Sequence, residues 1–409
     1  MPSIASAHER SRAGTRPQAA SIKPQVLALL PQIKATALAT ERAASVPAES
    51  IEMLRATGFF DIVKPQAFGG YEDDFDLLVD LTIELAKACP STAWVAGLLA
   101  AHQWLLASFP GEAQHDVWDH DPQAMLCGSY APATKAIAAP GGYRVSGRWS
   151  FASGCDNSSW SVCAALLPPA EDGTGRGPAF LLVPAQDYSI DDTWHVIGLA
   201  GTGSKTLVLD DAFVPAHRVL TFAETTSGRT PGAKLYPDNP TFAVPMLCDI
   251  PSCLAAVAVG AAQGALDDYL EATRTRLTRG AVAGAANRMA EFATVQLRVA
   301  DAAASADAAR EILLRDLRAV AKMARAGEEI TVRERITCRR GQAFAVWLAV
   351  RATEALNTST GGLGLDLTNP VQRAWRDVNA VGRHVSMNWD AVGTMYGQMA
   401  LGLEPKGQY

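Results

Sequence analysis

A block of short β-type runs between two helical stretches constrains the fold of this chain more than any other feature. Short β-type runs occupy residues 125–130, 143–151, 161–167, 179–183, 188–192 and 206–214, with Gly, Pro and Asp turns between them. No helical segment separates them, which is typical of an antiparallel barrel or sandwich and not of a parallel βαβ sheet. We therefore expect an α+β protein with a central β domain.

Helical periodicity dominates on both sides of this block. Residues 22–118 carry apolar faces with helical spacing, and Pro31 is expected to kink or restart the first helix. After Pro240 the chain is rich in alanine, and helices are expected at 240–276, 285–326, 329–358 and 369–395. Four long helices with short connections predict an up-down four-helix bundle. The second has few bulky residues, which indicates close packing or burial against another subunit.

These patterns divide the chain into four parts. Residues 1–21 have almost no large apolar side chain and no signal-peptide core, so a disordered tail is expected there. We expect an N-terminal helical domain at 22–123, a β domain at 124–235 and a C-terminal helix-bundle domain at 236–409. A chain of 409 residues is long enough for several domains.

Charge and composition limit the partners. The net charge is −6 and the isoelectric point is near 5.7, which argues against nucleic acid or an anionic membrane as the main partner. No apolar run reaches the roughly 18 residues that a membrane span requires. Seven scattered cysteines form no CxxC pair and no zinc-binding spacing with histidine. They predict reduced thiols in a cytoplasmic protein and no metal site.

Three common motifs of cofactor binding and nucleophilic catalysis do not fit. Residues 198–205 (GLAGTGSK) are similar to a Walker A loop, but Lys205 follows Ser204 instead of preceding it. No GxGxxG sequence follows a strand, so an NAD(P)H-binding domain is not expected. The nucleophile motif of serine hydrolases, GxSxG, is absent.

Residues 141–160 (GGYRVSGRWSFASGCDNSSW) form the best candidate for a ligand contact. A strand pattern here ends in small residues around Ser153. Small side chains let a flat ligand approach the backbone closely, and the Ser153 hydroxyl can donate to a ring nitrogen or carbonyl. An exposed β-hairpin would have much the same sequence.

An ordered series of motifs resembles the acyl-CoA dehydrogenase fold. The series consists of FGG at 68–70, residues 147–154, TWHVIGLAGTGS at 193–204, DAFVPAHR at 211–218, GGLG at 361–364 and Arg376-Asp377. With CPSTAW at 89–94 and the later His384, the series is similar to the two-component flavin-dependent monooxygenases of group D. Members of that group hydroxylate phenols and related aromatic compounds. The resemblance extends from residue 24 to 397.

The residues after Arg376-Asp377 distinguish two functions within this fold. The commonest acyl-CoA dehydrogenases place a catalytic Glu, in a Glu-Gly-Thr triplet, shortly after this Asp. This chain instead has His384, in the sequence RHVS, and no carboxylate before Asp390. Histidine titrates near neutrality and suits the transfer of a phenolic or flavin-peroxide proton. A surface histidine is the alternative interpretation, and an acyl-CoA dehydrogenase or oxidase is the alternative function.

The resemblance also implies a reaction and partners. Reduced FMN or FAD, supplied by a separate NAD(P)H:flavin reductase, would bind in the cleft between the β domain and the helix bundle. There it would react with O₂ to give a C4a-hydroperoxyflavin, which hydroxylates a small aromatic substrate. The flavin carries the reactive chemistry, while the protein orients the reactants and excludes water. The family resemblance further implies a homotetramer.

The same resemblance assigns residues to the site. The catalytic candidates are His384, His102 and Ser153, the last two as hydrogen-bond partners of the flavin or its peroxide. The expected flavin contacts are Trp149 and Phe151 at the ring, together with Ser153, Ser129, Thr202, Ser204, Gly361, Gly362 and Arg279. Arg279 lies near the place of the family's phosphate-binding arginine, although the usual R-x-x-F-G sequence is missing.

Overall fold

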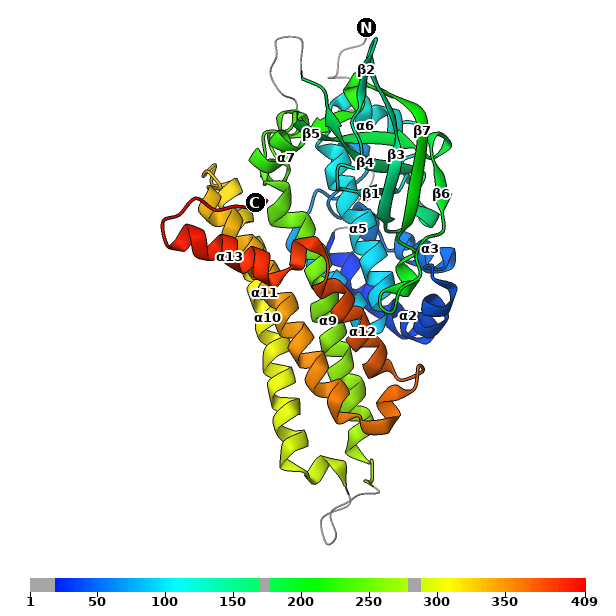
Figure 1. Ribbon diagram of the computed structural model, residues 1–409, viewed down its shortest axis with the longest axis vertical. Coiled ribbons are helices and arrows are strands. Elements are labelled where there is room, and N and C mark those ends of the chain that lie inside the picture. Colours follow the sequence, from blue (N-terminus) through cyan, green and yellow to red (C-terminus); the bar gives the residue numbers. More distant parts are fainter. Residues whose placement is uncertain (1–18, 170–176, 279–287) are drawn as a thin grey trace.

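The computed structural model describes residues 19–169, 177–278 and 288–409, so Arg279 and most of the expected tail lie outside it. A group of N-terminal helices and a β region lie against one end of a long C-terminal helix bundle (Figure 1). This is the acyl-CoA dehydrogenase-like architecture that the sequence predicts.

The N-terminal region consists of α2 (Ile22–Ala43), α3 (Ala48–Ala56), α4 (Phe75–Ala88), α5 (Pro90–Ala107) and α6 (Gly111–Trp118). The expected interruption at Pro31 is wrong, because α2 is one continuous helix through that residue. Pro31 lies on the exposed face of α2, where water can bind the carbonyl group that the proline leaves without an amide donor. Helix α5 is buried along almost its whole length.

The β region contains two four-stranded sheets. Their strand orders are β1-β4-β5-β8 and β2-β3-β7-β6, which confirms a two-layer arrangement. The strands are β1 (Leu126–Ser129), β2 (Ile137–Ala139), β3 (Gly142–Ala152), β4 (Trp160–Leu167), β5 (Gly177–Pro184), β6 (Ser189–Asp191), β7 (Lys205–Pro215) and β8 (Val219–Thr221). All six predicted runs form strands. One pairing departs from the antiparallel expectation, since β1 and β4 are parallel.

The first sheet has apolar residues on both faces. Cys163 and Leu181 face the second sheet, where they join a core that contains Trp149. Val162 and Phe180 point the other way and join the core of the helices. Burial on both sides explains why β4 and β5 are nearly continuous apolar runs.

The C-terminal bundle consists of α9 (Met246–Arg274), α10 (Ala293–Arg325), α11 (Val332–Ser359), α12 (Pro370–Gly382) and α13 (Trp389–Ala400). The short helices α7 (Phe222–Ser227) and α8 (Pro231–Leu235) precede it. The prediction of one helix over 369–395 is wrong, because the chain breaks between α12 and α13. The His384 side chain caps the short turn η11 (Val385–Met387), and the Asn388 side chain caps α13. These local hydrogen bonds compete with a continuous helix.

Helix α9 lies at the centre of the molecule, between α4, α10, α11 and α12 (Figure 1). Its length and composition would allow a membrane span, but 89% of its most apolar window is buried inside the protein. A Cβ at Gly260 would lie 2.1 Å from the Ile83 carbonyl oxygen, and one at Gly264 2.5 Å from that of Lys87. Glycine at these two positions therefore allows α4 to pack directly on α9.

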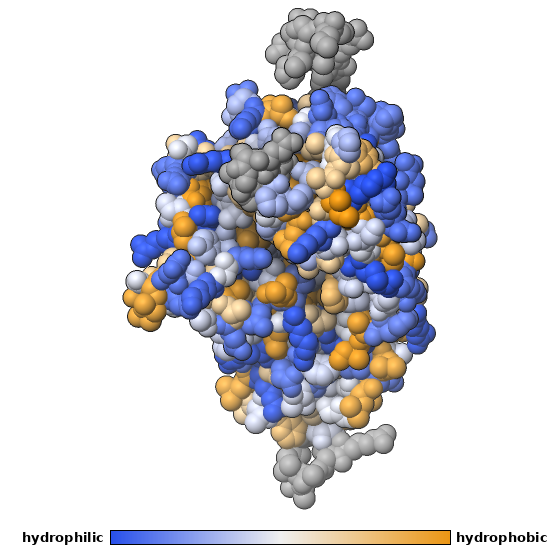
Figure 2. Space-filling model, turned by 45° about the horizontal axis from the view of Figure 1, so that its top comes forward, coloured by the Kyte–Doolittle hydropathy of each residue, from blue (hydrophilic) through white to orange (hydrophobic). Residues whose placement is uncertain are grey.

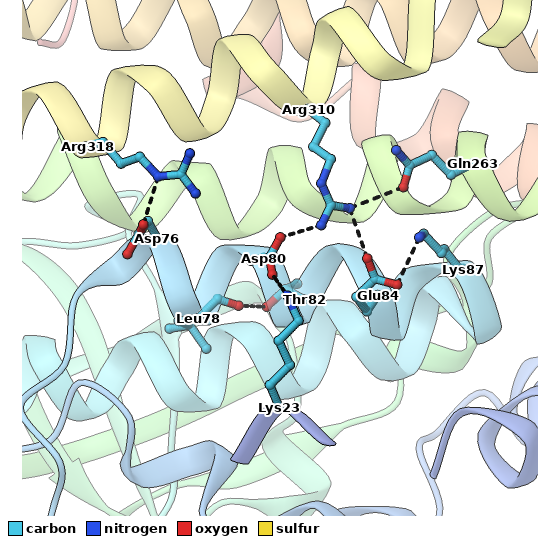
Figure 3. Close-up of polar contacts among 10 residues, drawn as sticks. All are labelled: Lys23, Asp76, Leu78, Asp80, Thr82, Glu84, Lys87, Gln263, Arg310 and Arg318. Atoms are coloured by element: carbon cyan, nitrogen blue, oxygen red, sulfur yellow. Dashed lines mark hydrogen bonds and ion pairs between the residues drawn. The ribbon is translucent and has the colours of Figure 1, made fainter. Parts of the chain in front are cut away.

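Ion pairs join the N-terminal helices to the bundle (Figure 3). Asp80 and Glu84 lie one turn apart on α4, and both pair with Arg310 of α10. Asp80 also binds Lys23 of α2, with 2.7 Å between Nζ and Oδ2. Further contacts in this view are Lys87 with Glu84, Gln263 with Arg310, and Arg318 with Asp76. This ion-pair cluster connects α2, α4, α9 and α10.

Candidate active site

The Arg376-Asp377 pair holds a loop at residues 197–204, here called the 197–204 loop. Asp377 is buried, and its Oδ1 accepts a hydrogen bond from the Leu199 amide at 2.6 Å. Arg376 donates to the Ile197 carbonyl, also at 2.6 Å, and pairs with Glu41 of α2. Burial raises the pKa of Asp377 to about 6, although the Leu199 amide opposes the shift. The motif therefore attaches α12 to a loop of the β region.

A chain of hydroxyl groups leads from this loop to Ser153. Thr202 Oγ1 donates to the Leu199 carbonyl at 2.9 Å and lies 2.7 Å from Ser204 Oγ. Ser204 Oγ lies 2.7 Å from Ser153 Oγ, which accepts from Trp94 Nε1 at 2.9 Å. Since each hydroxyl has one proton, Ser204 donates to Thr202, and Ser153 donates to Ser204. Ser153 thus keeps one free acceptor position in this network, and its expected hydrogen bond to a flavin stays a prediction.

His384 lies beside this chain of hydroxyls. Its ring contacts the edge of Trp94, with 5.8 Å between the ring centroids. Nδ1 accepts from the Ser386 amide at 3.2 Å, so in the neutral ring Nε2 carries the proton. Burial, and then the nearby Arg339, lower the pKa of His384 to about 4. His384 is therefore a neutral hydrogen-bond donor near pH 7, and not the surface residue of the alternative interpretation.

Arg339 of α11 fixes the backbone around His384. It donates to the Ser386 carbonyl at 2.7 Å and to the Gln342 side chain. Gln342 in turn donates to the Leu247 and Cys248 carbonyls at the start of α9. The break between α12 and α13 is thus held in place by a buried polar contact with two other helices.

Only one of the two aromatic residues expected at the flavin ring is accessible. Trp149 is fully buried between the sheets, where Nε1 donates to the Ala164 carbonyl at 2.7 Å, so its expected role is wrong. Phe151 is 70% exposed and has a φ of 66°. A register shift between Trp149 and Ala152 turns Phe151 away from the core. Its ring meets the edge of Trp194, with 6.0 Å between centroids.

Ser129 has a different contact from the one expected. It is buried at the end of β1, and its hydroxyl donates to the Ser150 carbonyl of β3 at 2.8 Å. This bond joins the two sheets beside Phe151. The proton is therefore used inside the protein, and a role of Ser129 in flavin binding stays a prediction.

His102 belongs to a second group of polar residues. It is buried, and its Nδ1 lies 2.6 Å from the Leu126 carbonyl oxygen. Because a carbonyl can only accept, Nδ1 carries the proton and Nε2 is a free acceptor. Burial lowers the pKa of His102 to about 4. The ring lies 5.8 Å from that of Tyr130, between centroids.

One face of α5 connects the two groups. Trp94, Leu98 and His102 are spaced by four residues, so they lie above one another on the same face. Leu98 is the only residue of α5 between Pro90 and Ala107 that is not buried. Along this face Trp94 and His102 are buried and Leu98 is half-buried, with the Ser153–His384 group at one end and His102 at the other.

The glycines expected at the flavin lie apart from this site within one copy of the chain. Gly361 and Gly362 begin the turn before α12, whereas His384 follows the other end of that helix. Helix α12, which separates the two glycines from His384, has 13 residues and is therefore about 20 Å long. Three further polar residues of this region, Tyr130, Arg339 and Asp249, were not singled out by the sequence analysis. The position of Asp249 as the one acid in the apolar sequence MLCDIPSC was a visible signal.

Comparisons with known proteins agree with this architecture. Residues 252–389 match the family model described as acyl-CoA dehydrogenase, C-terminal domain. The crystal structure of the HsaA monooxygenase from M. tuberculosis superimposes with a TM-score of 0.89 at 32% identity, over 96% of this chain and all of that one. XiaF from Streptomyces sp., in complex with FADH2 and glycerol, gives a TM-score of 0.85 at 28% identity, over 98% of each chain.

Curated relatives define the class more narrowly. The chain is 61% identical over 403 residues to the oxygenase component of an FADH(2)-dependent resorcinol hydroxylase from Rhizobium sp. (strain MTP-10005), covering 96% of this chain and 98% of that protein. It is 37% identical to the flavin-dependent monooxygenase oxygenase subunit HsaA of Rhodococcus jostii (strain RHA1), over 92% and 97%. Fold and site together define a flavoenzyme with the acyl-CoA dehydrogenase fold. More particularly, the chain belongs to the oxygenase components of the two-component flavin-dependent monooxygenases, and the acyl-CoA dehydrogenase alternative is not favoured.

Proposed function

We propose that this oxygenase component hydroxylates a dihydroxybenzene of the resorcinol type, with FADH2 supplied by a separate flavin reductase. The observation that carries this proposal is the 61% identity, over nearly the full length of both chains, to a resorcinol hydroxylase oxygenase component. The arrangement of polar groups along α5 supports it, because two kinds of hydrogen-bonding group lie at opposite ends of one face of this helix.

The residues around Ser153 fit a reduced flavin. The exposed ring of Phe151 offers an uncovered apolar surface to a flat ring system. A reduced flavin carries a ring N–H at N5, and Ser153 has one acceptor position left for it. His384 offers an Nε2–H on the same side. When bound, the reduced flavin activates O₂ for transfer to an electron-rich ring.

His102 fits the phenolic end of the substrate. Its Nε2 accepts the O–H of a ring hydroxyl, which fixes the orientation of the ring. Withdrawal of the hydroxyl proton toward nitrogen also makes the ring more electron-rich. Burial of His102 and Trp94 keeps this part of the site dry, and water exclusion limits unproductive loss of H₂O₂.

Other features of the sequence prediction stay part of this proposal. They are FAD as the flavin, a homotetramer, a cytoplasmic location, the division at residues 123 and 235, and cofactor contacts from Ser129, Thr202, Ser204, Gly361, Gly362 and Arg279. All seven cysteines are buried and unpaired, which supports a reducing compartment. Gly361 and Gly362 would reach the cofactor from a second copy of the chain.

The test is single-turnover chemistry with defined components. The purified chain is loaded anaerobically with photoreduced FAD, mixed with resorcinol and exposed to ¹⁸O₂. We expect a trihydroxybenzene carrying one ¹⁸O atom, formed without any reductase present. Bleaching of oxidised flavin by an acyl-CoA, with no oxygenated aromatic product, would instead establish the dehydrogenase alternative.

A further inference from the structure

A buried carboxyl group near His102 has no role in the contacts described so far. Asp249 lies in the first turn of α9 and is 3% exposed. In the described part of the chain its carboxyl group takes part in no hydrogen bond or ion pair; burial raises its pKa, and its titratable neighbours are the thiols of Cys248 and Cys253. An isolated carboxyl buried in this way is costly. An apolar side chain of similar volume would be more favourable here if Asp249 served folding alone.

The packing of α5 on α9 places Asp249 at the level of His102. A Cβ at Gly97 would lie 3.7 Å from Cys253 Cβ, so these two residues face each other. Farther along α5, Trp104 Nε1 donates to the Thr241 carbonyl just before α9, at 3.0 Å. The two helices are therefore antiparallel. Asp249 lies one turn before Cys253 on α9, and His102 lies at about the same level along α5, on a side of that helix different from that of Gly97.

A second polar group without a partner lies next to the same histidine. The hydroxyl of Tyr130 is buried and, within the described part of the chain, lacks a hydrogen bond. Gly128 allows its approach, because a Cβ there would lie 3.0 Å from the Tyr130 ring and 3.3 Å from that of His102. Burial, and then the nearby Cys253, raise the pKa of Tyr130 well above its ordinary range. Tyr130 thus lies close to both α9 and His102.

His102 and Tyr130 are therefore neighbours, and Cys253 of α9 lies near both Tyr130 and Asp249. The three buried polar groups of His102, Tyr130 and Asp249 lie around the place where the substrate ring is proposed to bind. His102 Nε2 can accept a hydrogen bond, the Tyr130 hydroxyl can donate or accept one, and the Asp249 carboxyl can accept one from a hydroxyl group. Phenolic hydroxyls are donors that also accept. A ring with one hydroxyl would satisfy His102 and leave Asp249 without a partner.

We propose that Asp249 and Tyr130 bind a second ring hydroxyl of the substrate, while the first hydroxyl binds His102, and that Asp249 selects dihydroxybenzenes over phenol. This inference rests on the proposed function, because it assigns the second hydroxyl of that substrate class. A site built to bind a hydroxyl group discriminates strongly against an analogue that lacks it, since the buried partner is left unpaired.

The experiment compares binding of resorcinol and phenol to the FADH2-loaded protein under anaerobic conditions by equilibrium dialysis. Asp249→Leu removes the polar group with little change in volume, and Tyr130→Phe removes only the hydroxyl. We expect resorcinol affinity to fall by about 10- to 100-fold in Asp249→Leu and by a smaller factor in Tyr130→Phe. Phenol affinity should stay the same or increase. Asp316→Asn is the matched control, because Asp316 is another buried acid, on α10, and pairs with Arg315.

The outcomes separate the two proposals. If wild-type protein hydroxylates resorcinol but the resorcinol-to-phenol affinity ratio is unchanged in both variants, the role of Asp249 is overturned and the proposed function stands. If wild-type protein neither binds nor hydroxylates resorcinol, the proposed function fails, and the Asp249 assignment falls with it. Thermal unfolding of Asp249→Leu provides a separate readout: its Tm should be no lower than that of wild type, because the variant replaces an unpaired buried carboxyl.

Discussion

The two histidines of the site are both neutral near pH 7, but they present opposite groups. Burial lowers both pKa values to about 4, with Arg339 adding to the effect at His384. His102 gives its Nδ1 proton to a carbonyl and offers a bare Nε2, whereas His384 accepts an amide at Nδ1 and offers Nε2–H. The backbone partner of each ring therefore sets its chemical role, an acceptor for substrate at one end of α5 and a donor at the other.

Replacement of His384 by alanine should uncouple the reaction. Without the Nε2–H donor, H₂O₂ release should rise and hydroxylated product should fall by about 10²–10⁴-fold, while FADH2 affinity changes little. Ser153→Ala should differ by weakening FADH2 binding in anaerobic dialysis. Because the pKa of His384 is about 4, product yield in wild type should show no step from this group between pH 6 and 8. Wild-type coupling in His384→Ala would contradict the assignment.

The ionisation of Asp377 should make stability depend on pH. Its pKa is about 6 in the folded protein, against 3.8 for an ordinary aspartate. Between these values the folded state binds more protons than the unfolded state, so stability falls as pH rises, by up to about 3 kcal/mol in total. Glu41, Arg373 and Arg376 face the same carboxyl and modify this shift.

The variant Asp377→Asn tests whether ionisation of Asp377 makes stability depend on pH. Asparagine keeps an oxygen for the Leu199 amide but cannot ionise. The fall in free energy of unfolding between pH 4.5 and 7.5, followed by urea titration, should be smaller in Asp377→Asn than in wild type. Equal pH slopes for the two proteins would show that Asp377 keeps an ordinary pKa.

At the scale of elements, the ion-pair cluster should contribute to docking of the N-terminal helices on the bundle. Arg310→Ala leaves Asp80 and Glu84 without their shared cation at a site where the arginine side chain is only 21% exposed. We expect a loss of about 1–3 kcal/mol in the free energy of unfolding. Arg318→Ala is the control: this side chain is 58% exposed and pairs with Asp76 alone, so its loss should cost less than about 1 kcal/mol. Similar losses in both variants would contradict a special role for Arg310.

The sequence predicted which segments are helices and which are strands, from hydrophobic periodicity and from Gly, Pro and Asp turn residues. It did not predict where a helix breaks or how a side chain within an element is oriented. All six predicted runs formed strands because turn residues delimit them: β3 alternates between buried and exposed residues, whereas β4 and β5 are nearly continuous apolar runs. The strands β2 and β8, at three residues each, were not predicted, although the equally short β6 was. The break at His384 depends on side-chain caps and on Arg339 from another helix, which no local pattern contains.

In the candidate site, too, some features could be predicted from the sequence and others depend on packing between distant segments. Ser153, Thr202, Ser204 and His384 converge as the motif resemblance implied. Trp149 and Phe151 share a period-two face in the sequence, and only the register shift of β3 against β7 separates a core residue from an exposed one. The direction of the hydroxyl chain depends on the Leu199 carbonyl, and the burial of Asp249 depends on the packing around α9. Both are properties of packing between distant segments.

At the scale of the whole molecule, the strand connections of the described sheets differ from those of a nucleotide-binding βαβ unit. The only parallel strand pair among the described sheets, β1 with β4, is connected through β2 and β3 instead of through a helix, so it is not a nucleotide-binding βαβ unit. The purified chain with FAD and resorcinol should therefore not oxidise NADH, and adding a flavin reductase should start turnover. NADH oxidation by the chain alone, followed at 340 nm, would contradict this expectation.

The surface also bears on assembly. The face in Figure 2 mixes hydrophobic and hydrophilic side chains, without one broad apolar area. The turn that follows Gly361 and Gly362 carries three exposed leucines, here called the leucine turn. Leu363, Leu365 and Leu367 are 63%, 82% and 65% exposed. Burial of each side chain against a second copy would contribute about 1.5–3 kcal/mol, and would bring the two glycines near another subunit.

We therefore predict that this leucine turn lies in a subunit interface of the proposed homotetramer. Wild-type protein should sediment as a tetramer at micromolar concentration, and Leu365→Lys combined with Leu367→Lys should give a smaller species, because two charges would have to be buried. Ile137→Lys, at a 70% exposed position of β2, is the matched control and should leave the tetramer intact. A wild-type monomer would contradict the tetramer itself. A tetramer that persists in the double variant would place the interface on another surface, and the FADH2 affinity of that variant should then equal that of wild type.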